Sequence, residues 1–331
     1  MLWLSEPPGR GITSTFSEKM NPPLILFPHE PFSPGKIDSE FASEYDAARV
    51  IGFPTGLYDH EAVESGDPKA ALKRLQDSDA HQKLILRGWM VPGESYAGLH
   101  AQLVAKGYLP QTSPEDYEQA HYIPFAYPQT EGHTPRSAWI EGDDVDAAWE
   151  MYQDFLDGDA IIKDWVKSAK SRWKDGCYIP AGTDEDRFRE IYRVFREERS
   201  KLFNRGVVLR EFMPIVERGS DIRGLPIIEE TRLFFWKGQI VVRPDGQPPS
   251  PLDELPRWEM IASRFSSPFI TIDVANLTDG TWKIVEVGDG GVSGLPLGLD
   301  PERFYGSLWN LTNGEQVADD QLPARAESES E

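Results

Sequence analysis

The sequence is poor in cysteine and in positive charge. A single cysteine, Cys177, stands among 331 residues, so neither an intrachain disulfide nor a zinc site built from several cysteines is possible. We therefore expect a reducing compartment, the cytoplasm. Lys and Arg number 34 against 55 Asp and Glu, which gives a formal net charge of −21. This charge disfavours binding to nucleic acids and to anionic membranes, because both require a basic surface.

Long apolar runs and several familiar enzyme motifs are also missing. The sequence has no run of about eighteen apolar residues, the length that a membrane-spanning helix needs. It has no Gly-x-x-x-x-Gly-Lys-Ser/Thr loop, no Rossmann glycine pattern after the first strand and no Gly-x-Ser-x-Gly elbow. None of the 6 histidines forms an i, i+4 pair for a metal. These absences argue against P-loop, Rossmann and related hydrolase chemistry.

The composition is that of a folded protein, with 39% hydrophobic residues. Apolar strands at 24–27 and 84–86 alternate with helical patterns such as 94–106, which predicts an N-terminal α/β lobe over 21–135. Residues 1–20 contain Pro, Gly and Ser without helical periodicity, and residues 316–331 are strongly acidic. We expect both ends to be disordered.

A strand pair in the last third of the chain carries two facing acids. If Asp279-Gly280 forms a two-residue turn, Asp273 lies directly opposite Glu286 on one face of the hairpin. Their Cβ atoms would then lie roughly 4.5–5.5 Å apart, among apolar neighbours. Either one carboxyl has a raised pKa, or a hard cation such as Mg²⁺ binds both, or the two are unrelated surface acids.

Glycine and acid follow this hairpin directly, in the sequence from Val285 to Gly291. Glycines let a backbone approach a ligand closely. Asp289 is a candidate third metal ligand, although an ordinary turn explains it equally well.

A basic segment interrupts the acidic background. Residues 163–174 contain five positive residues and one acid, together with Ser168 and Ser171. Such a segment can close over phosphates, or it can be a solvated charge run. Trp165 and Trp173 indicate that part of it packs against the protein.

Three arginines lie on or directly after apolar strands. Arg210 comes just before Glu211, Phe212 and Met213, at a place where a strand leads into a loop that could present backbone groups to a flat heterocycle. Arg232 and Arg87 each need an anionic partner, which is either a nearby acid or an anionic ligand.

The order of these features resembles the ATP-grasp superfamily, and more closely its clade named for two arginines and one lysine, family 3. The resemblance runs from about Leu24 to about Tyr305. It is carried by Arg87–Trp89, Thr134–Ser137, Ile162–Ser168, Val208–Phe212, Glu230–Arg232, Ile272–Ala275 and Glu286–Pro296. It implies an α+β (α/β) ATP-grasp fold, in which an N-terminal lobe precedes a domain over 136–315 whose two subdomains clasp ATP.

The resemblance also implies site residues. Lys163 would contact the nucleotide phosphates, the loop with Lys167, Ser168 and Lys170 would cover them, and the backbone of Glu211, Phe212 and Met213 would meet adenine. Asp273 and Glu286 would bind Mg²⁺. Many family members have Asn two residues after the metal-binding Glu, where this chain has Gly288, so Asp289 is the substitute. We assign the two arginines to Arg210 and Arg232, and Arg87 to the acceptor site.

The leading hypothesis is an ATP- and Mg²⁺-dependent carboxylate–amine ligase that works through an acylphosphate. Mg²⁺, Lys163 and Arg232 would neutralise charge, and the substrates would be an amino acid, a peptide or a protein terminus. The alternative is an ATP-binding assembly or regulatory factor without ligase activity, like the cell-division-cycle proteins that assist assembly of a translation initiation factor. An acidic surface would suit a basic protein partner. A third interpretation is an acidic α/β binding module that binds no nucleotide.

Overall fold

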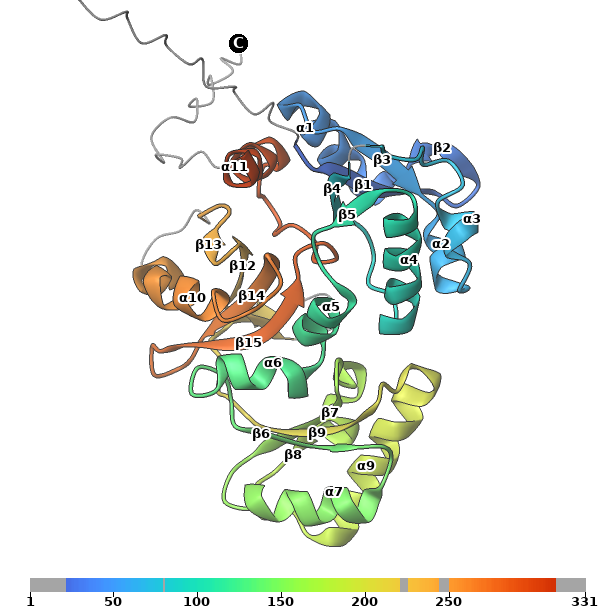
Figure 1. Ribbon diagram of the computed structural model, residues 1–331. Helices are drawn as coiled ribbons and strands as arrows, with labels where there is room; N and C mark the ends of the chain where they lie inside the picture. The colour runs from blue at the N-terminus through green and yellow to red at the C-terminus, as the bar shows by residue number, and fades with distance from the viewer. Residues whose placement is uncertain (1–21, 80, 221–225, 244–249, 314–331) are drawn as a thin grey trace, which may run out of the picture.

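The computed structural model describes residues 22–79, 81–220, 226–243 and 250–313. The predicted leader, 1–20, and the predicted acidic tail, 316–331, lie outside this part of the chain. Figure 1 shows the N-terminal sheet at the upper right, a second sheet in the middle and a third at the bottom. Among the described helices, none combines the length and apolar character that crossing a bilayer requires.

The N-terminal unit is a mainly parallel sheet in which β1 pairs with β3 and β4, and β4 pairs with β5. The predicted strands at 24–27 and 84–86 are confirmed as parts of β1 and β4. The strands are β1 (Leu24–Glu30), β2 (Ser33–Ile37), β3 (Thr55–Tyr58), β4 (Gln82–Leu86) and β5 (Tyr108–Pro110). The helices are α1 (Ala42–Ile51), α2 (His60–Glu64), α3 (Pro68–Ala71), α4 (Gly93–Ala105) and α5 (Pro114–His121).

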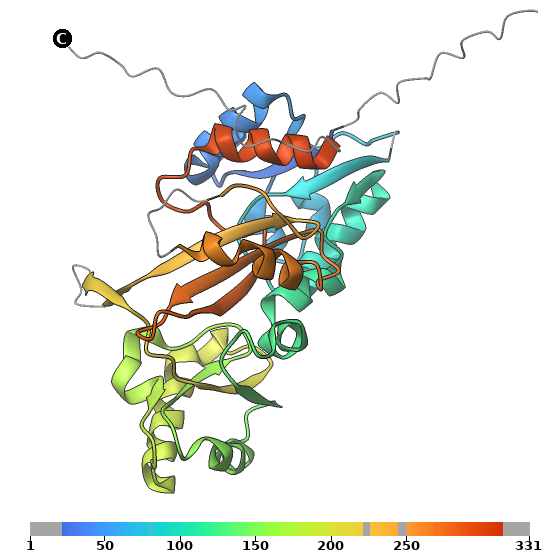
Figure 2. The same cartoon turned by 90° about the vertical axis from the view of Figure 1, so that its left-hand side faces the viewer.

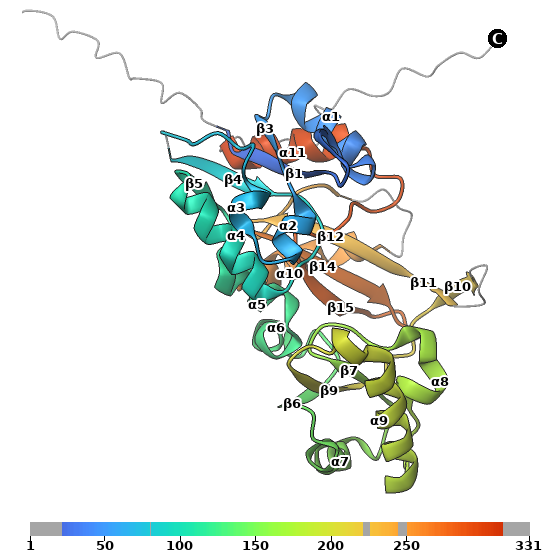
Figure 3. The same cartoon turned by 90° about the vertical axis from the view of Figure 1, so that its right-hand side faces the viewer.

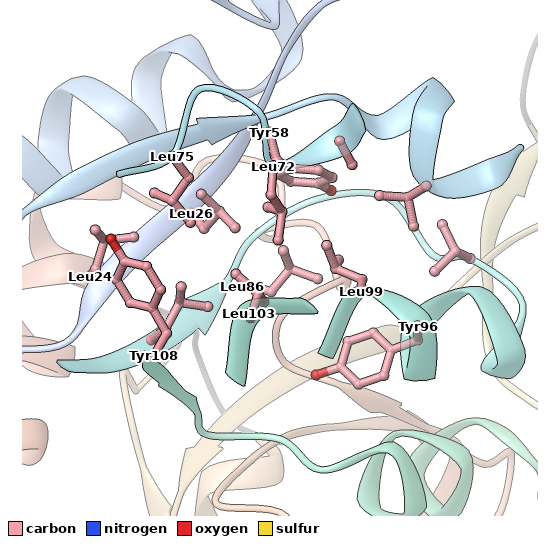
Figure 4. Close-up of a cluster of buried hydrophobic side chains, with 14 of the residues drawn as sticks. Leu24, Leu26, Tyr58, Leu72, Leu75, Leu86, Tyr96, Leu99, Leu103 and Tyr108 are labelled. Atoms are coloured by element: carbon pink, nitrogen blue, oxygen red, sulfur yellow. The ribbon is translucent and has the colours of Figure 1, made fainter. Parts of the chain in front are cut away.

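Both faces of this sheet are buried, and alternate residues serve the two faces. Leu24 and Leu26 of β1 pack with α4 residues in one cluster, which Figure 4 shows. Ile25 and Phe27 pack on the other side, against α1 and the C-terminal helix α11 (Pro301–Asn313). In Figure 2, α11 lies against the N-terminal unit although it is distant from it in sequence. The end of the described chain therefore closes the first lobe.

The middle sheet has the order β13-β12-β14-β15. The strands are β12 (Glu230–Trp236), β13 (Gln239–Ile240), β14 (Phe269–Asn276) and β15 (Trp282–Asp289). Lys237 and Gly238 connect β12 to β13 with φ of 49° and 80°, as a tight hairpin turn requires. One face of the sheet packs on α10 (Leu255–Ala262), with Trp258 fully buried between them. The opposite face meets the N-terminal lobe at one end and the cleft at the other.

The third sheet has the order β6-β9-β7-β8 and is antiparallel. Its strands are β6 (Ser137–Glu141), β7 (Ala160–Asp164), β8 (Tyr178–Ile179) and β9 (Gly206–Glu211). Helices α7 (Val145–Tyr152) and α9 (Glu185–Arg199) cover one face, and α6 (Ile123–Thr130) and α8 (Trp173–Gly176) lie at its borders. In Figure 3 the hairpin of β10 (Glu217–Ser220) and β11 (Pro226–Ile228) projects from the body. The uncovered face looks toward the middle sheet.

Candidate functional site

A pocket lies between the third sheet and the middle sheet. It is lined by Lys163 of β7, Arg210 of β9 and Glu286 of β15, among others. Ile162 and Leu209 belong to the core beneath the helices, so their neighbours Lys163 and Arg210 point to the opposite face, into the cleft. The two basic side chains are only 8% and 6% exposed. The structure thus brings together three residues that the sequence analysis selected separately.

A row of charged residues crosses the middle sheet at the edge of this pocket. Arg232 of β12 pairs with Asp273 of β14, and Asp273 pairs with Glu286 of β15. Directly paired residues of an antiparallel sheet point to the same face. The predicted juxtaposition of Asp273 and Glu286 is therefore confirmed, and Arg232 extends it by one strand.

The route to this pairing differs from the prediction. The two-residue turn at Asp279-Gly280 is wrong, because Asn276 pairs with Trp282 and the connection runs from Leu277 to Thr281. That register, continued, would place Val285 opposite Asp273. Instead the pairing shifts by one residue between Val274 and Asp273, leaving Val285 as a bulge. The bulge brings Glu286 opposite Asp273.

Side-chain cations neutralise the two acids, a solution that the sequence analysis did not consider. Arg232 donates from Nε to Oδ1 of Asp273 over 2.8 Å and from Nη2 to Oδ2 over 2.7 Å. Lys167 donates from Nζ to Oε1 of Glu286 over 3.1 Å. The Lys167 and Glu286 side chains are 48% and 37% exposed. Because Lys167 follows β7 of the third sheet, this second ion pair crosses the cleft, whereas the first lies within the middle sheet.

The segment that carries Lys167 is a tight turn rather than an open loop. Lys163 forms an isolated bridge with Ser168, and Oδ1 of Asp164 accepts hydrogen bonds from the N–H groups of Val166 and Lys167. Arg199 of α9 donates to Oδ2 of the fully buried Asp164 over 2.7 Å. The sequence analysis missed Asp164, which orders the turn from beneath.

The rest of the basic segment is helical: Lys170 begins the short 3₁₀ helix Lys170–Arg172, and α8 follows. The side chain of Lys170 lies outside the part of the chain that the structure describes. The segment is therefore folded close to the third sheet.

Arg210 holds protein oxygens. It donates from Nη1 to the carbonyl of Val285 over 2.6 Å, and from Nη2 to the carbonyl of Ile284 over 3.2 Å and to Oγ1 of Thr134. Burial lowers the pKa of the Arg210 guanidinium to about 10. Among the described residues its Nε has no hydrogen-bond partner. A buried cation with an unused donor fits an anion in the pocket.

The strand exit after Arg210 is bordered by aromatic rings. The ring of Phe212 lies 5.4 Å from that of Tyr178 and 6.1 Å from that of Trp173, between centroids. The N–H of Phe212 donates to the carbonyl of Asp159 over 2.9 Å. Glu211 is exposed and Met213 half-buried. Contact of this segment with a heterocycle stays a prediction.

Arg87 is not at an open acceptor site, which corrects the prediction. It is fully buried, and it binds both carboxylate oxygens of Glu44 at 2.8 to 3.0 Å. It also donates to the carbonyls of Gly290 and Ser293 over 2.6 and 2.8 Å. Tyr305 of α11 donates to the same Glu44. Arg87 joins the first lobe, the glycine-rich segment and the C-terminal helix.

Asp289 does not join the carboxylate pair either. It ends β15 and pairs with Ile270, three residues away from the Asp273–Glu286 pair. Its Oδ2 accepts from Oγ1 of Thr112 over 3.1 Å and its Oδ1 from the N–H of Gly291 over 2.8 Å. Burial raises the pKa of Asp289 to about 6. This carboxyl belongs to the contact with the N-terminal lobe, and the prediction of a third ligand is corrected.

His121 is a pocket residue that sequence reasoning missed. It lines the pocket with Lys163 and Glu286. Its Nδ1 lies 2.7 Å from the carbonyl of Tyr117, so Nδ1 carries the hydrogen and Nε2 has the lone pair. Burial lowers the pKa of His121 to about 4, which leaves a neutral imidazole at pH 7. No sequence spacing signalled it, because its neighbours in the pocket come from distant strands.

The donor set fits a hard divalent cation that is only partly coordinated by protein. The described residues contain no group of three or more His, Cys, Asp or Glu side chains that could hold a metal. Asp273 and Glu286 would therefore supply two carboxylates, and phosphate oxygens and water the remaining positions, as is common for Mg²⁺. Lys163 and Arg210, buried beside this pair, suit the phosphates of such a complex.

Comparison with known proteins concerns the fold and the family of this chain. Residues 150–308 match the family model of the ATP-grasp domain in the clade of two arginines and one lysine, family 3. No curated protein sequence matches the chain.

Solved structures resemble the chain over most of its length, at low sequence identity. A RimK domain ATP-grasp protein from Sphaerobacter thermophilus has 13% identity and a TM-score of 0.54, over 87% of this chain and 98% of the other. D-cycloserine synthetase DcsG has 14% identity and a TM-score of 0.52, over 87% and 99%. Macrocyclase MdnC from Microcystis aeruginosa, bound to the precursor peptide MdnA, has 11% identity and a TM-score of 0.51, over 86% and 99%. The predicted fold is thus confirmed: the chain has the ATP-grasp fold, and its residues 150–308 form an ATP-grasp domain of family 3 of the clade of two arginines and one lysine.

Proposed function

We propose that the cleft binds ATP with Mg²⁺ and that the protein is an ATP-dependent carboxylate–amine ligase. The observation that carries this proposal is the charged row of Arg232, Asp273 and Glu286, because Glu286 lines one pocket together with the buried cations Lys163 and Arg210. A Mg-nucleotide needs both signs of charge, carboxylates for the metal and cations for the phosphate oxygens. The pocket offers both within one narrow space.

Asp273 and Glu286 would hold Mg²⁺, which supplies charge neutralisation and orientation of the phosphates. In this structure, Arg232 and Lys167 occupy these two carboxylates. Both cations become available to phosphate oxygens once the carboxylates turn to the metal. The two ion pairs therefore keep the charged row neutral while no nucleotide is bound.

The reaction follows from phosphoryl transfer to a carboxylate. A carboxylate oxygen of the substrate attacks the γ-phosphorus of ATP, the bond to the bridging oxygen of ADP breaks, and an acylphosphate forms. An amine then attacks the acyl carbon, phosphate leaves, and the amine loses a proton. Lys163 and Arg232 stabilise negative charge during transfer, which is mainly a matter of positioning and electrostatics.

Two of the structural relatives suggest the substrate class. One is a D-cycloserine synthetase, and another is a macrocyclase bound to a precursor peptide. We infer that the acceptor here is an amino acid or a peptide, presented from the N-terminal lobe. Arg87 ties the carbonyls of Gly290 and Ser293 to this lobe, and the carbonyl of the next residue, Gly294, accepts a hydrogen bond from Nη1 of Arg232 over 3.2 Å.

The test is release of ADP and phosphate from Mg-ATP in the presence of paired amino acids and short peptides, with product masses measured. The ligase predicts turnover that needs both a carboxylate and an amine, and a product lighter than their sum by one water. Arg232→Met should abolish turnover. Binding of ATP without turnover in any mixture, together with a stable complex with a basic protein, would instead indicate the assembly factor.

A further inference from the structure

The bulge at Val285 decides whether the two acids of the site can act together. Next to the turn, β14 and β15 are paired so that Val274 lies opposite Ile284. Without an extra residue, the next pair would be Asp273 with Val285, and Glu286 would point into the apolar core beside Ile272. With the bulge, Glu286 turns to the cleft. A one-residue irregularity therefore creates the carboxylate pair.

A bulge leaves backbone groups without partners in the ladder, so it needs other donors. Arg210 supplies them from the facing sheet, since its Nη1 and Nη2 bind the carbonyls of Val285 and Ile284. Thr134 donates from Oγ1 to the carbonyl of Ile284 over 3.0 Å and accepts from Arg210. The N–H of Ile284 donates to the carbonyl of His133 over 2.8 Å. The bulge is thus fixed by groups outside its own hairpin.

We propose that Arg210 and Thr134 are positioning residues that hold the Val285 bulge and through it aim the Glu286 carboxylate at the metal. The planar guanidinium suits this role, because its fork reaches two adjacent carbonyls at once, which an ammonium group cannot do. Thr134 is buried, and among the described residues its hydroxyl bonds only Arg210 and the carbonyl of Ile284, directly before the bulge. This inference rests on the proposed function, from which the metal-binding role of Glu286 comes.

The proposal separates two roles for Arg210. A phosphate ligand would affect nucleotide affinity whether or not Mg²⁺ is present. A residue that aims Glu286 acts mainly on the part of the affinity that Mg²⁺ contributes. That part is the ratio of the dissociation constant of ADP in EDTA to the dissociation constant in excess MgCl₂.

The experiment measures this ratio by calorimetry for wild type, Thr134→Val and a matched control, Thr183→Val. Thr183 is also buried, and its hydroxyl donates to the carbonyl of Pro180 over 2.7 Å, away from the cleft. We expect Thr134→Val to lower the ratio about five- to tenfold, the effect of one hydrogen bond, with the dissociation constant in EDTA nearly unchanged. Thr183→Val should leave the ratio as in wild type.

Arg210→Lys provides the second measurement, because it keeps a cation near the phosphates but gives up the two-carbonyl contact. The proposal predicts a ratio lowered at least as much as in Thr134→Val. It is overturned if Arg210→Lys weakens binding equally in EDTA and MgCl₂, or if Thr134→Val behaves like Thr183→Val. A wild-type ratio near one would instead contradict the proposed metal site itself.

Discussion

Two arginine–carboxylate ion pairs of this protein differ in how deeply the arginine is buried. Arg87 and Glu44 are enclosed, and Arg87 also binds the carbonyls of Gly290 and Ser293. In the cleft, Arg232 is bound to Asp273 and is 34% exposed on its side chain. The first pair holds two parts of the fold together. The second borders the cleft that we propose as the nucleotide site.

Burial therefore separates the structural Arg87 from Arg232, the arginine that we propose for the site. Breaking a buried pair leaves an uncompensated charge, which is strongly destabilising. The exposed Lys167–Glu286 pair beside Arg232 contributes little to stability, so its members can change partners at small cost. The comparison predicts opposite responses to mutation in the two regions.

The largest effect is expected from Glu44→Gln. It leaves Arg87 charged and buried without a carboxylate, so the free energy of unfolding should fall by about 3–5 kcal/mol, measured by urea denaturation. Glu40→Gln, at an exposed position of the same region, is the control and should change it by less than about 0.5 kcal/mol. If Glu44→Gln lowers the free energy of unfolding by less than about 1 kcal/mol, the Arg87–Glu44 pair would not differ in stability from the exposed pair in the cleft.

A smaller, pH-dependent effect is expected from Asp289→Asn. Burial raises the pKa of Asp289 from its ordinary value of 3.8 to about 6 in the folded protein. The protonated carboxyl therefore contributes to the free energy of unfolding of the wild type below about pH 4. This contribution is lost as the pH rises through about 6. Asparagine can keep the contacts with Thr112 and Gly291 without the charge.

Relative to wild type, Asp289→Asn should thus gain stability between about pH 4 and pH 7, by at most about 3 kcal/mol. Urea denaturation across this range measures the difference. A stability difference that does not vary with pH would contradict the raised pKa of the buried Asp289 carboxyl. Weaker Mg-ADP binding by this variant would indicate that Asp289 is a metal ligand after all.

The smallest effect on stability is expected from Lys167→Met. The Lys167–Glu286 pair is exposed, so the free energy of unfolding should change by less than about 0.5 kcal/mol. The affinity for Mg-ADP should nevertheless fall, and its dependence on salt should weaken, because one cation facing the phosphates is gone. Lys201→Met removes an exposed lysine elsewhere and should leave both affinity and salt dependence unchanged. Identical behaviour of the two variants would contradict a role of Lys167 in the cleft.

Much of the fold and part of the site could be predicted from the sequence, because they depend on local patterns. Alternating apolar strands located β1, β4, β14 and β15. The Asp273–Glu286 pairing was also predicted, although from a turn that does not exist; a longer connection and a bulge lead to the same pair. Sequence spacing predicts which face of the sheet a residue points to only as far as the next bulge, because a bulge reverses the alternation.

The errors concern residues whose partners are distant in the chain. Arg87 finds Glu44, 43 residues away, and Gly290, 203 residues away, and no local pattern distinguishes it from Arg232. Asp289 meets Thr112 across 177 residues. His121 enters the pocket only because the third sheet folds back over α5 and α6. Tertiary packing decides which polar residues are saturated, and it is not encoded within a short window.

The most direct test of the Mg-nucleotide site is titration of ADP in excess MgCl₂ by calorimetry, on wild type and on the double variant Asp273→Asn, Glu286→Gln. The substituted side chains keep their shape and lose the charges that the metal requires. The account predicts clear binding by the wild type and loss of the Mg²⁺-dependent part of the affinity in the double variant, with the folded state retained. Equal affinity of both proteins for Mg-ADP would contradict it.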